Sequence, residues 1–145
     1  VYTPQLVING EKEMVGNDAN KIAAALKNAR AIESSGHLTI NNVSVEGIKA
    51  TINYTIQKNE NKVLLNIALV QSKITTSIKS GENGGIKLTN ANVVRNFKSV
   101  PSLSESTNNI SIDLVAGVDK KDFSVVIFLQ DPKTLKIFAA TKSSL

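Results

Sequence analysis

The chain has 145 residues, a mass of 15.5 kDa and a net charge of +5, and 41% of its residues are hydrophobic. This length and apolar content suit one domain with a packed core, or one domain and a fragment of another, and argue against a disordered chain. There is no cysteine, which excludes a disulfide, a thiolate nucleophile and a cysteine-ligated zinc site within these residues.

The basic residues do not form the pattern of a nucleic-acid binder. Only Arg30 and Arg95 among the 17 basic residues are arginine, the lysines are scattered, and aromatic residues make up 4%. Proteins that bind nucleic acid cluster lysine and arginine and interleave aromatic side chains that stack on bases. We therefore expect a solvated lysine-rich surface and no nucleic-acid partner. We also expect no membrane span, because the longest apolar run, VLLNIALV, is too short to cross a bilayer.

Residues 1 to about 33 predict a β-hairpin followed by a helix. The strand candidates QLVI and KEMV stand on either side of Asn9-Gly10, a pair that takes the positive φ angles of a type I′ turn. In the next segment, GNDANKIAAALKNARAI, Asp18 or Asn17 can cap the start of a helix. The apolar residues that recur there at helical spacing are Ile22, Leu26 and Ala29, with Ile32 as a further candidate.

This hairpin and helix need a cover, since a two-stranded hairpin is marginal in water. The apolar side chains to be covered are Leu6, Ile8, Val15, Ile22 and Leu26. Leaving them exposed would forfeit roughly 10 kcal/mol of stability, as much as the whole stability of a typical domain. The cover has three possible sources: the rest of the chain, a second copy, or a segment absent from this sequence.

From residue 37 onward the sequence has the pattern of β-strands. In GIKATINYTIQ apolar and polar residues alternate, and the expected inward residues are Ile48, Ala50, Ile52, Tyr54 and Ile56. KVLLNIALVQ is apolar on both faces and suits a central strand, and the alternation slips near Gln71-Ser72, which predicts a bulge or bend. Later strands end with two that are joined by a turn at Asp131-Pro132. Seven or eight such strands predict an antiparallel β-sandwich.

The N-terminal segment resembles the C-terminal half of a thioredoxin fold. The matching residues, in order, are Thr3-Pro4, Asn9-Gly10-Glu11 and Val15-Gly16, followed by the amphipathic helix. The resemblance implies an α+β fold in which residues 1–35 are the C-terminal half of a thioredoxin-like domain and residues 36–145 are an antiparallel β-sandwich domain. It also implies a cis Thr3-Pro4 bond in a loop that offers backbone groups to a bound chain, so Thr3 and Pro4 are candidate ligand- or peptide-docking residues.

A second stretch, SGENGGIKLTNANVVRNF, resembles the signature of a bacterial secreted family known only as domain of unknown function 1223. Members of that family join a thioredoxin-like N-terminal part to a C-terminal β-domain, and this chain looks like the C-terminal portion. One departure is Asn90, where many relatives have histidine. The resemblance implies that the natural product is longer and exported, with a secreted, periplasmic or outer-membrane-associated location.

The same stretch holds the other candidate site residues. Gly81, Glu82, Asn83 and Gly85 form a glycine-rich loop, but it lacks the Lys-Ser/Thr pair of a phosphate-binding loop. We expect Gly81, Gly84 and Gly85 to take positive φ angles there. Asn92 and Arg95 lie near the family signature. Arg95 is expected to clamp the interdomain junction by bonding Glu82 or a C-terminal carbonyl, with bidentate binding of a carboxylate as the alternative. His37 is the single histidine and is expected to be a surface or structural residue, so no metal site and no cofactor are predicted.

The sequence names no substrate. We expect an exported binding or interaction module that is not catalytic as this cysteine-free chain, and that docks an envelope protein or an extended peptide through a strand edge. The alternative is a thiol–disulfide oxidoreductase whose redox cysteines lie in a missing N-terminal segment. A third possibility is a structural domain that holds a homodimer together. The expected partners are the missing N-terminal half or a second copy of the chain.

Overall fold

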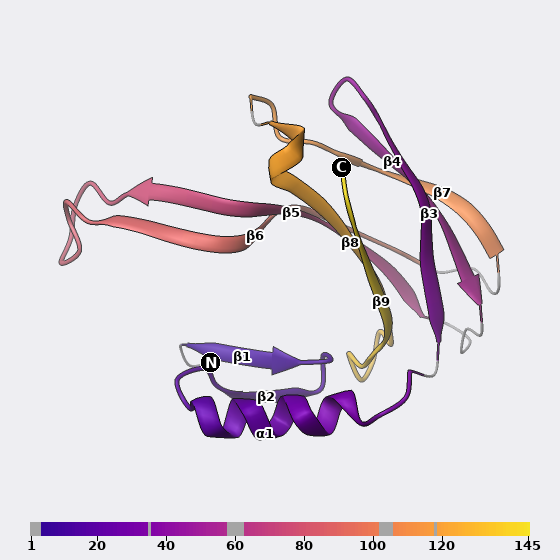
Figure 1. Cartoon of the computed structure of the whole chain (residues 1–145), viewed down its shortest axis with the longest axis horizontal. Coiled ribbons are helices and arrows are strands. Elements are labelled where there is room, and N and C mark those ends of the chain that lie inside the picture. Colours follow the sequence, from indigo (N-terminus) through magenta and orange to yellow (C-terminus); the bar gives the residue numbers. More distant parts are fainter. Residues whose placement is uncertain (1–3, 35, 58–62, 102–105, 118) are drawn as a thin grey trace.

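A computed structural model describes residues 4–34, 36–57, 63–101, 106–117 and 119–145 (Figure 1). The strands are β1 (Gln5–Ile8), β2 (Lys12–Val15), β3 (His37–Glu46), β4 (Lys49–Gln57), β5 (Leu64–Ser77), β6 (Lys87–Pro101), β7 (Ser106–Asp113), β8 (Phe123–Gln130) and β9 (Ile137–Ser144). The helices are α1 (Ala19–Arg30) and one 3-10 turn, η1 (Lys120–Asp122). Strands account for 61% of the described residues and helix for 12%.

The strands form three antiparallel sheets. Their orders are β1-β2, β3-β4-β7 and β6-β5-β8-β9. The two larger sheets share one hydrophobic core, to which both contribute fully buried side chains, such as Ile52 and Ile56 from β4 and Leu65, Ile67 and Ile127 from β5 and β8. The antiparallel strands expected from residue 37 onward are therefore present, and they pack as two facing layers.

The alternation predicted for β4 is confirmed, with one exception. Ala50, Ile52, Tyr54 and Ile56 are all buried, and they alternate with half-exposed polar residues. Ile48 was expected to share this inward face, but it is 63% exposed. The reason is that β3 and β4 are joined by a tight turn at Gly47, which has a φ of 57°, so Ile48 belongs to the turn and not to the strand.

The hairpin and helix at the N-terminus form as their local signals indicate. Asn9 and Gly10 both have positive φ angles, 50° and 77°, and the Glu11 amide donates to the Ile8 carbonyl at 3.2 Å, which closes the turn. Asp18 caps α1, because its Oδ1 accepts from the Lys21 amide at 3.0 Å. That hydrogen bond also lowers the pKa of the Asp18 carboxyl.

The prediction of a thioredoxin-like α+β fold is wrong. The chain is mostly β, with three antiparallel sheets and one α-helix among the described residues. A turn pair, a helix cap and an apolar period specify a hairpin followed by a helix, but they do not specify the fold in which the two are used. Here the hairpin contacts the end of the β8–β9 turn. At that point the amide of Ile137, the first residue of β9, donates to the Asn9 carbonyl at 2.9 Å.

The cover of this N-terminal unit is partial. Ile8 and Ala25 are buried, whereas Val7, Val15 and Leu26 remain 52%, 43% and 39% exposed. Within the described ranges, no helix has the length and apolar character needed to span a membrane.

The strands β5 and β6 are much longer than the others, and only part of each lies in the two-layer body. Beyond residue 71 the pair continues outward as a two-stranded hairpin, which projects to the left in Figure 1. We call residues 72–92 the arm. The register between β5 and β6 shifts at Leu69/Val70, where Arg95 is the extra residue on β6. A bulge or bend was predicted near Gln71-Ser72; the register shift lies between Leu69 and Val70, and its extra residue is on the partner strand β6.

Candidate functional site

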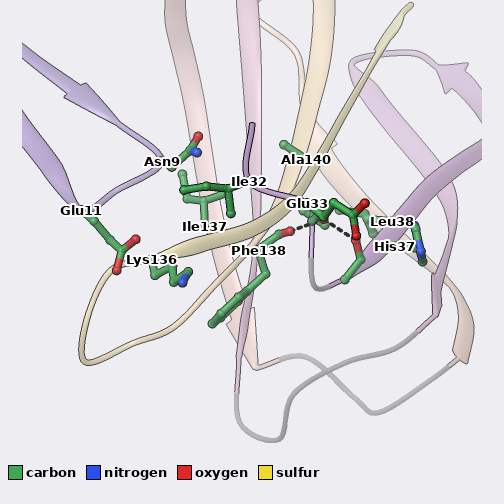
Figure 2. A pocket seen from close by; sticks show the side chains of 13 residues that line it. Asn9, Glu11, Ile32, Glu33, His37, Leu38, Lys136, Ile137, Phe138 and Ala140 are labelled. Carbon is green, nitrogen blue, oxygen red and sulfur yellow. Dashed lines mark hydrogen bonds between the residues drawn. The ribbon is translucent and has the colours of Figure 1, made fainter. Parts of the chain in front are cut away.

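A cavity of about 470 Å³ lies where the N-terminal unit meets the body (Figure 2). Its lining residues are Asn9, Glu11, Ile32, Glu33, Ser34, Gly36, His37, Leu38, Lys136, Ile137, Phe138, Ala139 and Ala140. The size is that of a small-molecule pocket. However, the walls come from the β1–β2 turn, the segment after α1 and strand β9, so the cavity is a junction between packed units.

The polar groups of this cavity serve the junction. The Ser34 hydroxyl lies 2.6 Å from the Gly36 carbonyl and 2.5 Å from the Phe138 carbonyl, so it ties the segment after α1 to β9. The Lys136 ammonium lies 6.0 Å from the centre of the Phe138 ring, a cation–π contact. In Figure 2, Glu11 and Lys136 lie on one side and Glu33 and His37 on the other, so the charged groups do not converge on one point.

No metal site is evident in the part of the chain that the structure describes, where no three His, Cys, Asp or Glu residues form a group. The carboxyl groups with a lowered pKa are exposed and have local causes. Asp119 is held by the side chain of Lys121, and Asp131 by the backbone amides of Thr134 and Lys133. These are the contacts of turns and caps, and they do not resemble the buried, perturbed groups of a catalytic centre.

The arm is the second candidate, and its two faces differ in chemistry. Opposite residues share a face in an antiparallel pair, and the register pairs Ile74 with Asn90 and Thr76 with Leu88. The pairing continues to the Ile78 amide, which donates to the Ile86 carbonyl at 2.9 Å. One face of the arm therefore carries four apolar side chains, which belong to Ile74, Ile78, Ile86 and Leu88. Ile86 and Leu88 are 51% and 49% exposed.

The opposite face of the arm is polar and basic. The register places Ser77 against Lys87 and Lys73 against Ala91. The hydroxyls of Thr75 and Thr89 lie 3.0 Å apart between them. β-branched threonine favours the strand conformation, and the lysines keep this face in water.

The predicted glycine-rich loop is the tip of the arm. Gly81 and Gly85 have φ angles of 85° and 84°, as expected, but Gly84 does not have a positive φ. The Gly84 amide instead donates to the Gly81 carbonyl at 2.9 Å, within a turn that also contains Glu82 and Asn83. The Ile86 amide donates to the Asn83 carbonyl at 3.2 Å. All the loop residues are exposed.

Asn92 and Arg95 lie at the base of the arm. Asn92 has a φ of 52°, and Arg95 donates from Nη1 to Oε1 of the buried Gln71. Glu82, one of the partners considered for Arg95 from the sequence, lies at the other end of the arm, roughly 25 Å along the strand. The arginine therefore ties β6 to β5 at the bulge where the arm leaves the body.

The remaining expected residues lie apart from the arm. Pro4 begins the described chain and is exposed. Its carbonyl accepts from the Gly16 amide at 2.7 Å, beside the β1–β2 hairpin. Thr3 lies outside the described residues, and so does the bond between Thr3 and Pro4.

Two residues that the sequence did not single out link the two layers of the body. Asn96 donates from Nδ2 to the Asp113 carbonyl at 3.0 Å, and Lys98 lies within 3.4 Å of the Ser111 carbonyl. Both bonds link β6 to β7 across the two layers. Their only signal in the sequence is alternation, because Asn96 and Lys98 are two residues apart and so share one face of β6.

Comparison with known proteins gives a family and a fold. A family model described as "Protein of unknown function (DUF1223)" matches residues 1–130. The X-ray crystal structure of protein AGR_C_4864 from Agrobacterium tumefaciens, a structural genomics target, superposes with a TM-score of 0.66 at 18% sequence identity. The match covers 98% of this chain and 61% of that one, so the chain spans about three fifths of that protein's length. No curated protein matches.

Proposed function

Since the chain belongs to the DUF1223 family of proteins of unknown function, we propose that it is an interaction module that works by binding and not by catalysis. The observation that carries this proposal is the arm: a two-stranded hairpin that projects from the body with an exposed apolar face and a basic face. Exposed apolar side chains in a contiguous group are typical of binding surfaces. The body holds the base of the arm through the bond from Arg95 to Gln71.

The distribution of titratable groups supports binding over catalysis. Catalytic acids and bases are usually held in clefts where burial or a neighbouring charge shifts their pKa. In the described residues, the carboxyls with a shifted pKa are exposed turn and cap residues. Thiol–disulfide chemistry, the alternative expected from the sequence, rested on a thioredoxin-like fold, and the mostly β structure gives that alternative no support.

A further part of the proposal concerns the N-terminal unit. Val7, Val15 and Leu26 are 39–52% exposed there, and Ile32 is 71% exposed. We propose that another part of a longer protein, or a second copy of the chain, covers these side chains. The length of the Agrobacterium tumefaciens protein, of which this chain spans 61%, is consistent with such a longer product.

Export from the cell is also proposed, on the basis of the resemblance to a secreted family. Fractionation of cells that express the complete gene tests it: the product should appear outside the cytoplasm. Recovery only with cytoplasmic markers would contradict export and leave the binding role untouched.

The binding role is tested by shortening the arm in the complete gene product. Replacing residues 73–91 with Asn-Gly joins Ser72 to Asn92 through a two-residue turn. These two residues lie between the pairs Gln71–Val93 and Lys73–Ala91 of the ladder. We expect a partner that co-purifies in stoichiometric amount with the unaltered protein to be lost from the shortened one. The matched control is Gly47→Asn in the β3–β4 turn. A side chain at this position enters open space, so this variant should retain the partner. Retention by the shortened protein would overturn the proposal.

A further inference from the structure

We propose that the outer edge of β6, from Lys87 to Ala91, binds an extended acidic segment of a partner protein, which adds to the arm as a further strand. This inference rests on the proposed function, because it assigns a partner chemistry to the arm. The mode of binding is strand addition, in which backbone hydrogen bonds give affinity and alternate side chains give specificity.

The first argument is that the arm part of this edge is open. β6 is the edge strand of its sheet. Within the body, side chains of β6 contact the other sheet, because Asn96 and Lys98 reach the backbone carbonyls of Asp113 and Ser111 on β7. Over the arm, no other described strand lies on the outer side of β6. An edge strand presents unpaired amide and carbonyl groups, which are a template for another chain.

The second argument is charge. Residues 72–95 contain Lys73, Lys79, Lys87 and Arg95 but a single acidic residue, Glu82. The difference, +3, is more than half of the net charge of +5 carried by the whole chain. A strand that added to β6 would run beside Lys87, which favours an acidic side chain at the facing position, since opposite charges across strands attract.

The third argument is the alternation of the two faces. Leu88 lies on the apolar face, next to Ile78 and Ile86, while Lys87 and Thr89 lie on the basic face. The side chains of an added strand alternate in the same way. The segment that fits is therefore one in which acidic and apolar residues alternate, with the apolar ones continuing the face of Ile86 and Leu88.

Two other occupants fit less well. Pairing with the arm of a second copy would bring together two segments of charge +3, which repel each other. Insertion of the arm into an anionic bilayer would bury its tip. Residues 79–85 of the tip include no apolar side chain and contain Glu82. Burial of an unpaired carboxylate is costly.

The test measures peptide binding by the complete chain with fluorescence anisotropy. The probe is a labelled peptide of about ten residues in which Glu and Val alternate, long enough to cover the five residues of the edge. Three comparison peptides are used: one with the same composition in two blocks, one with Lys in place of Glu, and one with N-methylated backbone amides on alternate residues. We expect the alternating acidic peptide to bind at least about tenfold more tightly than any of these, because each lacks the alternation, the charge or the backbone donors.

Variants locate the site. Lys87→Glu should weaken binding of the acidic peptide by about tenfold, since it replaces an attraction by a repulsion. The matched control Lys142→Glu, an exposed position on β9, makes the same change in net charge and should leave binding unchanged. Thermal unfolding of both variants checks that they fold.

Several outcomes would overturn the inference. These are equal binding of the block peptide or the N-methylated peptide, no effect of Lys87→Glu, a dimer in sedimentation that is lost when the arm is shortened, or binding of the arm to anionic vesicles in place of the peptide. If the peptide fails but the shortened gene product still loses its co-purifying partner, the proposed function stands and only the partner chemistry is wrong. If neither peptide binding nor retention of the partner depends on the arm, the proposed function and the proposed partner chemistry are both wrong.

Discussion

The inner and outer parts of the β5–β6 pair share one ladder but have opposite surroundings. In the inner part Leu65, Ile67 and Leu69 are fully buried between the two sheets. In the outer part nearly all side chains from residue 72 to 92 are exposed. The pairing is antiparallel throughout. The comparison teaches that ladder hydrogen bonds alone do not make a core: the same backbone supports a buried strand and an exposed arm, and the side chains decide which.

The boundary between the two parts is built from irregular backbone. Arg95 is the extra residue of the β6 bulge and Asn92 has a positive φ, so two irregular residues lie within four positions of β6. Bulges bend a strand and increase its twist. On the inner side, Phe97 and Phe128 lie 6.3 Å apart on the strands that flank β5. This arrangement accounts for the burial of Ala68, which the register places between these strands.

The largest expected effect on stability comes from truncating one apolar side chain in the inner part and comparing it with the same change in the outer part. Ile67→Ala removes a fully buried side chain and should lower the free energy of unfolding by about 2–5 kcal/mol, through lost transfer energy and the cavity left behind. Leu88→Ala on the arm should change it by less than about 0.5 kcal/mol, since that side chain is half exposed. Urea denaturation measures both. Similar losses for the two variants would mean that the arm is packed against something in solution.

The boundary itself is tested next. Arg95→Ala leaves the buried Gln71 amide oxygen without its donor, and we expect a loss of about 1–3 kcal/mol in the free energy of unfolding. The matched control is Arg30→Ala, which removes the other arginine of the chain, exposed at the end of α1. It should cost less than about 0.5 kcal/mol. If the two arginines prove equal, the bond to Gln71 does not hold the bulge.

Much of the local structure was predictable, because it depends on neighbouring residues. The Asn9-Gly10 turn, the Asp18 cap and the buried face of β4 follow from φ preferences and side-chain alternation. The seven strands from β3 to β9 match the seven or eight expected. Tertiary placement was not predictable in the same way. The N-terminal hairpin and helix were assigned to the wrong fold, since their signals are common to many folds.

The arm was missed for a different physical reason. Ile74 and Ile78 alternate with polar residues as a strand beside a core would, and alternation shows that a face is apolar without showing that it is covered. The contacts of Arg95, Asn96 and Lys98 were missed too, because their partners lie 13 to 24 residues away or on another strand. Single residues carry no signal of such distant pairing.

The buried core also predicts a smaller effect on the free energy of unfolding, which appears at alkaline pH. Tyr54 is 8% exposed on β4, and burial raises its pKa above the usual 10.0. The folded state therefore holds the phenolic proton more tightly than the unfolded state. The contribution to stability is intact below pH 10 and is lost as the pH rises through the higher folded pKa.

Unfolding of the protein and of Tyr54→Phe between pH 8 and about 11 measures this contribution. The free energy of unfolding should fall more steeply above pH 10 in the unaltered protein, because phenylalanine cannot ionise. Parallel curves would mean that Tyr54 reaches water in the folded state and is not part of a closed core.

Removing the arm altogether should also have little effect on stability. Replacing residues 73–91 with Asn-Gly takes away almost all of the outer ladder but none of the fully buried side chains. The melting temperature should therefore stay within a few degrees of that of the unaltered chain, a shift that corresponds to about 1 kcal/mol or less. A turn of Asn-Gly suits the antiparallel ends that it joins. A large loss of stability, with the bond from Arg95 to Gln71 kept, would show that the outer ladder supports the body. Near-constant stability with lost partner binding would mean instead that the inner part of β5 and β6 serves the fold and the outer part serves recognition.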